Sequence, residues 1–85
     1  MKVTVLYFAR LREAVGRDRE AVELPPDVET VAARRQWLIA RGAPWADAFT
    51  EIKRIRAAVD QRMVAEDARL ADGAEVAFFP PVTGG

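Results

Sequence analysis

The chain has no cysteine, no histidine and no serine among its 85 residues. It therefore cannot build a disulfide, a thiolate zinc site, a cysteine–histidine pair or a serine triad from its own side chains. These absences remove most of the usual nucleophiles. The lack of cysteine also fits the cytoplasm, where we expect the protein to act.

An excess of charge of either sign is missing as well. Lysine and arginine together number 13, and so do aspartate and glutamate. No net field therefore favours nucleic acid or a membrane, and we expect neither as a partner. The apolar run 3–9 is too short to span a bilayer and short for a signal-peptide core, so we interpret it as a strand. Hydrophobic residues make up 51% of the chain, as in a soluble globular domain, and partners should be recognised through shape and apolar patches.

Strand and helix signals alternate along the chain. β-branched and aromatic residues, or alternating polar and apolar residues, predict strands, and helix formers followed by glycine predict helices. Thr30 is suited to cap the main helix. The predicted elements are strands at 2–8, 19–24, 55–59, 63–64 and 75–79, helices at 9–15 and 31–41, and a short turn at 45–49. This order predicts an α+β domain in which a mixed sheet packs on one main helix. The ubiquitin-like β-grasp fold has this order, and so do other small α+β folds, so the order alone does not distinguish them.

Side chains alternate between the two faces of a strand, so a charged residue marks the solvent-facing side. Glu75 marks the face that Phe79 shares, and Lys2 marks the face that Phe8 shares. The same faces carry Thr4, Leu6 and Ala77, and the core faces carry Val3, Val5, Tyr7, Val76 and Phe78. If the first and last strands are neighbours, Phe8 and Phe79 form an exposed apolar patch, which is a sign of a partner site. The alternative is that a helix or loop covers both aromatic rings.

The C-terminal segment Pro80-Pro81-Val82-Thr83-Gly84-Gly85 is the most informative part of the chain. Two prolines end the last strand, so we expect a domain of residues 1–79 and an extended tail of residues 80–85. Glycine has no Cβ, and Gly84 and Gly85 therefore form a narrow end suited to threading a channel in another protein. The reactive group would be the Gly85 carboxylate. It requires activation, for example adenylation, because a carboxylate is a poor acyl donor. The ATP must be bound by another protein, since the glycines of this chain form no phosphate-cradling loop.

Other residues are weaker candidates for function. We interpret the scattered carboxylates as solvated rather than catalytic or metal-binding, and the basic side chains as mostly solubilising. The carboxylates are Asp47, Glu51, Glu66, Asp67 and Asp72, and the basic residues are Arg10, Arg12, Arg34, Arg35, Lys53, Arg54 and Arg56. Trp37 and Trp45 are interpreted as helix-packing anchors rather than a stacking platform.

The two ends of the chain resemble the small, sulfur-carrying subunit of molybdopterin synthase. The matching segments are Val-Leu-Tyr-Phe-Ala-Arg-Leu-Arg-Glu at 5–13 and Gly-Ala-Glu-Val-Ala-Phe-Phe-Pro-Pro-Val-Thr-Gly-Gly at 73–85. The segment 57–61 is also similar, with Asp60 where the family usually has asparagine. Ala74 stands where an acid is more common, and Arg34 where an apolar residue is common. These departures concern helix packing and turns and leave the tail untouched.

The resemblance implies a β-grasp sulfur carrier in molybdenum cofactor biosynthesis. In this family a ubiquitin-activator-like enzyme uses ATP to adenylate the terminal glycine, here Gly85, and a sulfur donor system converts it to a thiocarboxylate. The tail then enters the large synthase subunit and gives its sulfur to the cyclic pterin precursor. The resemblance also implies partner contacts at Phe8, Met63 and Phe79 and along Pro80–Gly85, and a heterotetramer of two small and two large subunits. The chain itself would bind no cofactor or metal, and it would not be an enzyme alone.

Three alternatives remain open on the sequence. A carrier for thiamin or another sulfur pathway would share the Gly-Gly end, although it is not expected to have the Phe-Phe-Pro-Pro root. A ubiquitin-like protein modifier would form isopeptide bonds through Gly85. A binding module with an inert tail would not need Gly84 and Gly85.

Overall fold

A mixed sheet, with five strands among the described residues, forms the frame of the protein. The computed structural model describes residues 1–52 and 54–80. The strands are β1 (Lys2–Tyr7), β2 (Arg19–Glu23), β3 (Arg56–Val59), β4 (Arg62–Val64) and β5 (Glu75–Phe79), in the sheet order β2-β1-β5-β3-β4. β1 and β5 run parallel, and the other neighbouring pairs are antiparallel. The predicted strands are found, with bounds shifted by no more than a residue, and the first and last strands are neighbours at the centre of the sheet.

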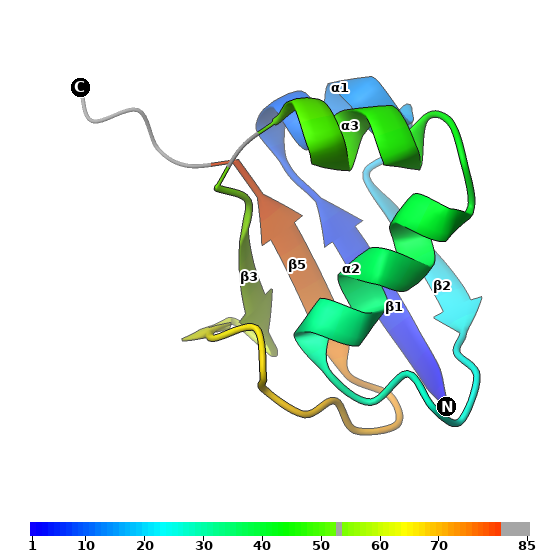
Figure 1. Cartoon of the computed structure of the whole chain (residues 1–85). Helices are drawn as coiled ribbons and strands as arrows, with labels where there is room; N and C mark the ends of the chain where they lie inside the picture. The colour runs from blue at the N-terminus through cyan, green and yellow to red at the C-terminus, as the bar shows by residue number, and fades with distance from the viewer. Residues whose placement is uncertain (53, 81–85) are drawn as a thin grey trace.

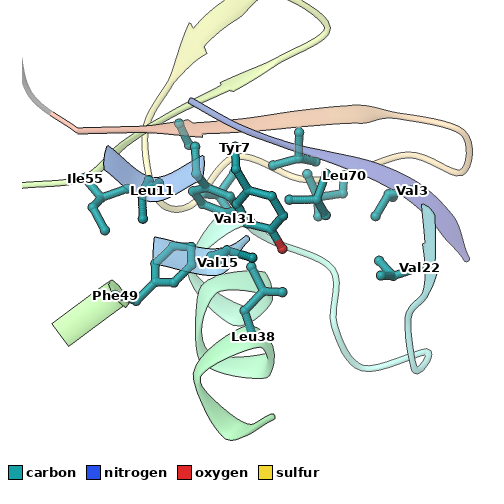
Figure 2. Close-up of a cluster of buried hydrophobic side chains, with 14 of the residues drawn as sticks. Val3, Tyr7, Leu11, Val15, Val22, Val31, Leu38, Phe49, Ile55 and Leu70 are labelled. Carbon is teal, nitrogen blue, oxygen red and sulfur yellow. The ribbon is translucent and has the colours of Figure 1, made fainter. Parts of the chain in front are cut away.

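In the part of the chain that the structure describes, three helices cover one face of this sheet (Figure 1). They are α1 (Ala9–Val15), α2 (Val31–Ala40) and α3 (Trp45–Glu51). Figure 2 shows the apolar side chains that fill the space between the two layers. The core contains Val3, Val5, Tyr7, Val76 and Phe78 from the sheet and Leu11, Val15, Val31, Leu38, Ala48 and Phe49 from the helices. The predicted α+β architecture of the ubiquitin-like β-grasp type is therefore confirmed.

Local signals explain where the first two helices begin and end. Thr30 caps α2 as predicted, because its Oγ1 accepts a hydrogen bond of 3.1 Å from the Ala33 amide. Gly16 ends α1 in the left-handed conformation, with a φ of 85°, which favours glycine.

The segment predicted as a short turn at 45–49 is instead the helix α3. Tertiary packing explains the difference. Phe49 packs edge-on against Phe78 of β5, with ring centroids 5.3 Å apart, and Ala48 is also buried. These contacts add to the modest helix preference of a short segment that would not be stable alone.

Arg34 contradicts its predicted solubilising role, because the structure buries its side chain completely. It lies three residues after Val31 and four before Leu38, so the helical period places it on the core face of α2. Its guanidinium stacks 5.0 Å from the centre of the Trp37 ring. None of its three nitrogens has a hydrogen-bond partner among the described residues. Burial lowers the pKa of Arg34 to about 10.

Arg35 is also more than a solubilising residue. It donates a hydrogen bond of 2.9 Å to the Ile55 carbonyl and forms an ion pair with Glu66. It thereby joins α2 to the segment before β3 and to the loop after β4. Asp72 likewise is more than a solvated carboxylate, because its Oδ1 accepts a hydrogen bond of 2.7 Å from the Lys2 amide.

A polar cluster on the helical side joins β1, β2 and α3. The Tyr7 hydroxyl donates to Glu20 at 2.7 Å and accepts from the Trp45 indole at 3.2 Å. Arg41 donates to both Glu20 oxygens and stacks 3.8 Å from the centre of the Trp45 ring. Burial alone would raise the pKa of the Glu20 carboxyl, but the hydrogen bonds from Tyr7 and Arg41 outweigh it and lower that pKa. Burial, followed by the bond to Glu20, raises the pKa of Tyr7.

The two tryptophans pack as predicted. Trp37 and Trp45 are partly buried against the core, and Trp45 is held by its hydrogen bond to Tyr7. Within residues 1–52 and 54–80, no helix has the length and apolar character needed to cross a membrane.

Candidate docking face and tail root

The face of the sheet opposite the helices carries a continuous row of side chains. The row crosses all five strands in the order Arg19, Leu6, Ala77, Ala58 and Met63. Directly paired residues of neighbouring strands project to the same side of a sheet. We call this side the open face.

A hollow of about 640 Å³ lies on the open face. Ala58 and Ala77 are its central residues, and their short side chains leave room between the larger ones around them. The hollow is lined by Leu6, Phe8, Arg19, Ala58, Gln61, Met63, Glu75, Ala77 and Phe79. The face thus offers an apolar depression with charged residues at its rim.

Two of the predicted contact residues are the large hydrophobic side chains that the described part of the chain exposes. Phe8 is 46% exposed and Met63 is 55% exposed. Phe79 was predicted to be exposed, but the structure shows it half-buried. The structure therefore brings Phe8, Met63 and Phe79 to one hollow, and no described helix or loop covers it.

Leu6 departs from the prediction that its whole face is solvent-exposed, because only 9% of it is accessible. It stands on a central strand, between Arg19 of β2 and Ala77 of β5. Neighbours on both sides, together with Phe8 at the end of the strand, shield a residue of this size. Parity gives the face of a side chain, but the cross-strand neighbours decide how much of it water reaches.

Phe8 and the start of the tail are fixed by backbone hydrogen bonds. The Phe8 amide donates to the Phe78 carbonyl at 3.2 Å, which extends the contact between β1 and β5 beyond the end of β1. The Phe8 carbonyl accepts from Leu11 at 3.1 Å and starts α1. Pro80 follows β5 and is half-buried. The open face therefore adjoins the point where the tail leaves the domain (Figure 1).

The remaining predicted tail residues, Pro81, Val82, Thr83, Gly84 and Gly85, lie outside the described residues. Their roles stay predictions. Lys53 also lies outside them.

The turn between β3 and β4 positions Met63. The sequence analysis predicted a turn here but not the backbone conformation and hydrogen bonds that hold it. Asp60 and Gln61 form this two-residue turn with φ values of 48° and 70°, as tight hairpin turns require. Asp60 also clamps the start of β5: its amide donates to the Glu75 carbonyl at 2.9 Å, and its Oδ1 accepts from the Glu75 amide at 3.0 Å. The asparagine-like position of Asp60 was the available signal, since aspartate and asparagine both tolerate positive φ.

The described residues contain no group of three or more carboxylate side chains arranged to hold a metal ion. The charged residues at the rim of the hollow are instead Arg19 and Glu75, one of each sign. The arrangement is suited to recognising a protein surface.

Comparison with known proteins places the chain among relatives of the same length. A model of the ThiS family matches residues 5–85. The molybdopterin synthase sulfur carrier subunit of Escherichia coli is 51% identical over 83 residues, which cover 98% of this chain and 99% of that protein.

Solved structures have the same fold. SAMP1 from Haloferax volcanii superimposes with a TM-score of 0.78 at 25% identity, with each chain covered completely. A chain in the complex of subunits 1 and 2 of the molybdopterin-converting factor from Helicobacter pylori superimposes with a TM-score of 0.66 at 17% identity, again with complete coverage of both chains. The chain therefore belongs to the ThiS family, in which its full-length relatives include sulfur carrier subunits of molybdopterin synthase.

Proposed function

We propose that this protein is the sulfur carrier subunit of a molybdopterin synthase and acts in the cytoplasm in molybdenum cofactor biosynthesis. The observation that carries the proposal is full-length similarity to the Escherichia coli sulfur carrier subunit, together with a family match that extends to Gly85. The absence of cysteine, histidine and serine agrees with a chain whose reactive group is its own C-terminus.

The proposed chemistry takes place at the Gly85 carboxylate. A carboxylate is a poor acyl donor, so an activating enzyme first uses ATP to convert it to an acyl adenylate. Sulfur from a donor system then displaces the adenylate and leaves a thiocarboxylate. In the large synthase subunit, two such carriers in succession each give one sulfur to the cyclic pterin precursor, cyclic pyranopterin monophosphate, because the dithiolene of molybdopterin contains two sulfur atoms. The catalytic side chains belong to the partners, and ATP binds to the activating enzyme.

The open face is proposed to bind the large subunit and the activating enzyme. Phe8, Met63 and Phe79 adjoin the root of the tail, so a protein bound there is in position to receive residues 80–85. A tail of six residues reaches at most roughly 20 Å, and docking of the domain must therefore place its root close to the partner's active site. Two carriers and two large subunits are expected to form the complete synthase.

A second candidate is a ubiquitin-like protein modifier, which the similarity to the archaeal modifier SAMP1 favours. In that case Gly85 would form isopeptide bonds with lysine side chains of other proteins. Conjugates that are resolved on a gel and disappear when Gly85 is deleted would support this alternative.

The test is the intact mass of the purified chain after incubation with an adenylating enzyme, ATP and a sulfide source. A gain equal to the replacement of one oxygen by sulfur is expected, and the same chain without Gly85 should show none. Absence of the gain, with an activating enzyme that loads another carrier in parallel, would contradict the proposal.

A further inference from the structure

The strand β2 forms an edge of the sheet, because β1 is the only described strand that pairs with it. Residues of an antiparallel strand direct their backbone groups alternately toward one side and toward the other. At one end of β2 the Tyr7 amide donates to the Asp18 carbonyl at 2.9 Å. At the other end the Leu24 amide donates to the Met1 carbonyl at 2.7 Å. The even-numbered residues therefore bond to β1, and the backbone groups of the odd-numbered residues face outward.

The outward-facing residues of β2 are Arg19, Ala21 and Glu23. All three are exposed, and their amides and carbonyls form no hydrogen bond with any residue that the structure describes. Their side chains share the open face, since Arg19 pairs in register with Leu6. Unpaired donors and acceptors in a row are a template for one more strand.

The two ends of β2 carry opposite charges. Arg19 forms no ion pair with another described residue. Glu23 lies 3.1 Å from the N-terminal amino group, but 72% of its side chain is still exposed. An antiparallel copy of the same strand, centred on Ala21, brings each Arg19 opposite the Glu23 of the other copy. The same pairing satisfies every outward donor and acceptor of both strands.

Other registers of β2 lack this match. A shift by two residues places Arg19 opposite Ala21 in one direction and opposite Pro25 in the other, and proline has no amide hydrogen to donate. The opposite edge of the sheet is also less suitable. β4 has only three residues, and a copy centred on its middle residue would bring Arg62 opposite Val64, so that no opposite charges meet.

We propose that two copies of this chain associate through β2, in an antiparallel pairing centred on Ala21 with each Arg19 opposite the Glu23 of the other copy. A two-fold axis perpendicular to the sheet relates the copies, so their open faces lie on the same side of one continuous sheet. The contact is confined to one strand, and we therefore expect a weak dimer that forms at roughly millimolar concentration. β1 separates β2 from β5, so the pairing leaves the root of the tail free.

NMR spectra recorded at increasing concentration test the pairing residue by residue. Between about 20 μM and about 1 mM, the amide signals of Arg19, Ala21 and Glu23 should shift, because these groups enter hydrogen bonds between copies. The amides of Glu20 and Val22 already face β1 and should shift less. Sedimentation equilibrium over the same range should show a rising mean mass. A chain that stays monomeric, or shifts that centre on β4, would overturn the inference.

The backbone contact is tested by Ala21→Pro, which removes the central outward amide hydrogen. Proline is tolerated on an edge strand where the amide faces solvent, so this variant should fold. Its dimer should weaken at least roughly tenfold, because the two-fold axis removes two hydrogen bonds at once. Ala21→Val is the matched control, since it keeps the amide and suits a strand, and it should dimerise at least as well. An unchanged dimer of Ala21→Pro would contradict the pairing.

Charge reversal tests the register. Arg19→Glu and Glu23→Arg each place like charges opposite one another and should weaken the dimer roughly threefold to thirtyfold. The double variant with both changes restores the opposite pairs and should recover most of the original affinity. Arg62→Glu, on the other edge strand, is the matched control and should dimerise like the original chain. No recovery in the double variant would overturn the register.

The inference does not depend on the proposed function. A chain that dimerises through β2 but is not loaded with sulfur would leave the inference in place and contradict the carrier role. A chain that is loaded with sulfur but stays monomeric at about 1 mM would do the reverse. Pairing of β2 with a strand of another protein, without self-association, would overturn the choice of a second copy.

Discussion

The buried guanidinium of Arg34 provides a quantitative test of the packing described above. Its side chain is fully buried beside Trp37, and its nitrogens have no hydrogen-bond partner among the described residues. A buried charge without a close partner is costly, and its replacement by an apolar residue of similar shape is often stabilising. Methionine retains an unbranched, flexible stem of similar length. We therefore expect Arg34→Met to stabilise the protein.

The magnitude follows from the pKa of Arg34. Its fall from 12.5 to about 10 corresponds to a penalty of about 3 kcal/mol on the charged form in the folded state. The lost stacking on Trp37 offsets up to about 2 kcal/mol of this, since the pair is desolvated. The free energy of unfolding should rise by about 1–2 kcal/mol. In a domain of this size the corresponding rise in Tm is roughly 5–10 °C.

Urea unfolding followed by circular dichroism measures the change, with Arg35→Met as the matched control. Arg35 has its partners at Ile55 and Glu66, so this neighbouring substitution should instead cost about 1–2 kcal/mol. The direction in which the stability difference changes with pH also follows from the pKa of Arg34. Because the folded-state pKa of Arg34 is lowered, the folded protein loses this proton first, and the penalty fades as pH rises through about 10. The advantage of Arg34→Met should therefore shrink at high pH.

Tyr7 is present in both proteins, and its raised pKa makes the stability of both fall with pH at the alkaline end. The charge of Arg34 lowers the pKa of Tyr7, so this fall is steeper in Arg34→Met and acts in the same direction as the loss of its advantage at high pH. A destabilised Arg34→Met variant, or an advantage that does not depend on pH, would refute the reasoning. Such a result would mean that the guanidinium contributes more through its contacts than its burial costs.

Three further predictions concern the turn, the polar cluster and the docking face. Asp60→Ala should lower the free energy of unfolding by about 1–2 kcal/mol in urea titrations, because it removes the bond to Glu75 and places alanine at positive φ; Asp60→Asn should cost much less, and equal losses would contradict this account. Because the pKa of Glu20 is lowered in the folded state, the ionised carboxylate stabilises the fold. This stabilisation is complete above the unfolded-state pKa of roughly 4 and is lost as pH falls from there through the folded-state pKa. The stability difference between the original chain and Glu20→Gln should therefore shrink in acid, and a constant difference would argue against the ionic role. Met63→Ser should weaken binding to the large synthase subunit at least roughly tenfold while Tm changes little, and full binding would exclude Met63 from the interface.

Much of the fold could be predicted from local patterns. Alternation in the first and last strands correctly assigned Val3, Val5 and Phe78 to the core, since one face of this sheet is covered and the other is open. The capping role of Thr30 is equally local, because it depends on residues within one helical turn.

The structure differs from the sequence predictions mainly where residues far apart in the chain pack together. The helix α3 depends on Phe49 packing against Phe78, and the shielding of Leu6 depends on strands to both sides. Arg34 is a different case, because its burial follows from the local helical period although its charge predicts exposure. The ring on which its guanidinium stacks belongs to Trp37, three residues later in the same helix. The hollow between Ala58 and Ala77 also needs the register of three strand pairs, which no single segment contains.

The central claim is that Gly85 carries sulfur to the pterin, and transfer in a reconstituted synthase tests it most directly. The thiocarboxylated chain would be mixed with the large subunit and cyclic pyranopterin monophosphate, and molybdopterin and the mass of the carrier would be followed together. The account predicts that molybdopterin appears as the carrier returns to its carboxylate mass, and that the chain lacking Gly85 supports no synthesis. Retention of sulfur by the carrier, in a large subunit that is active with the Escherichia coli carrier, would contradict it.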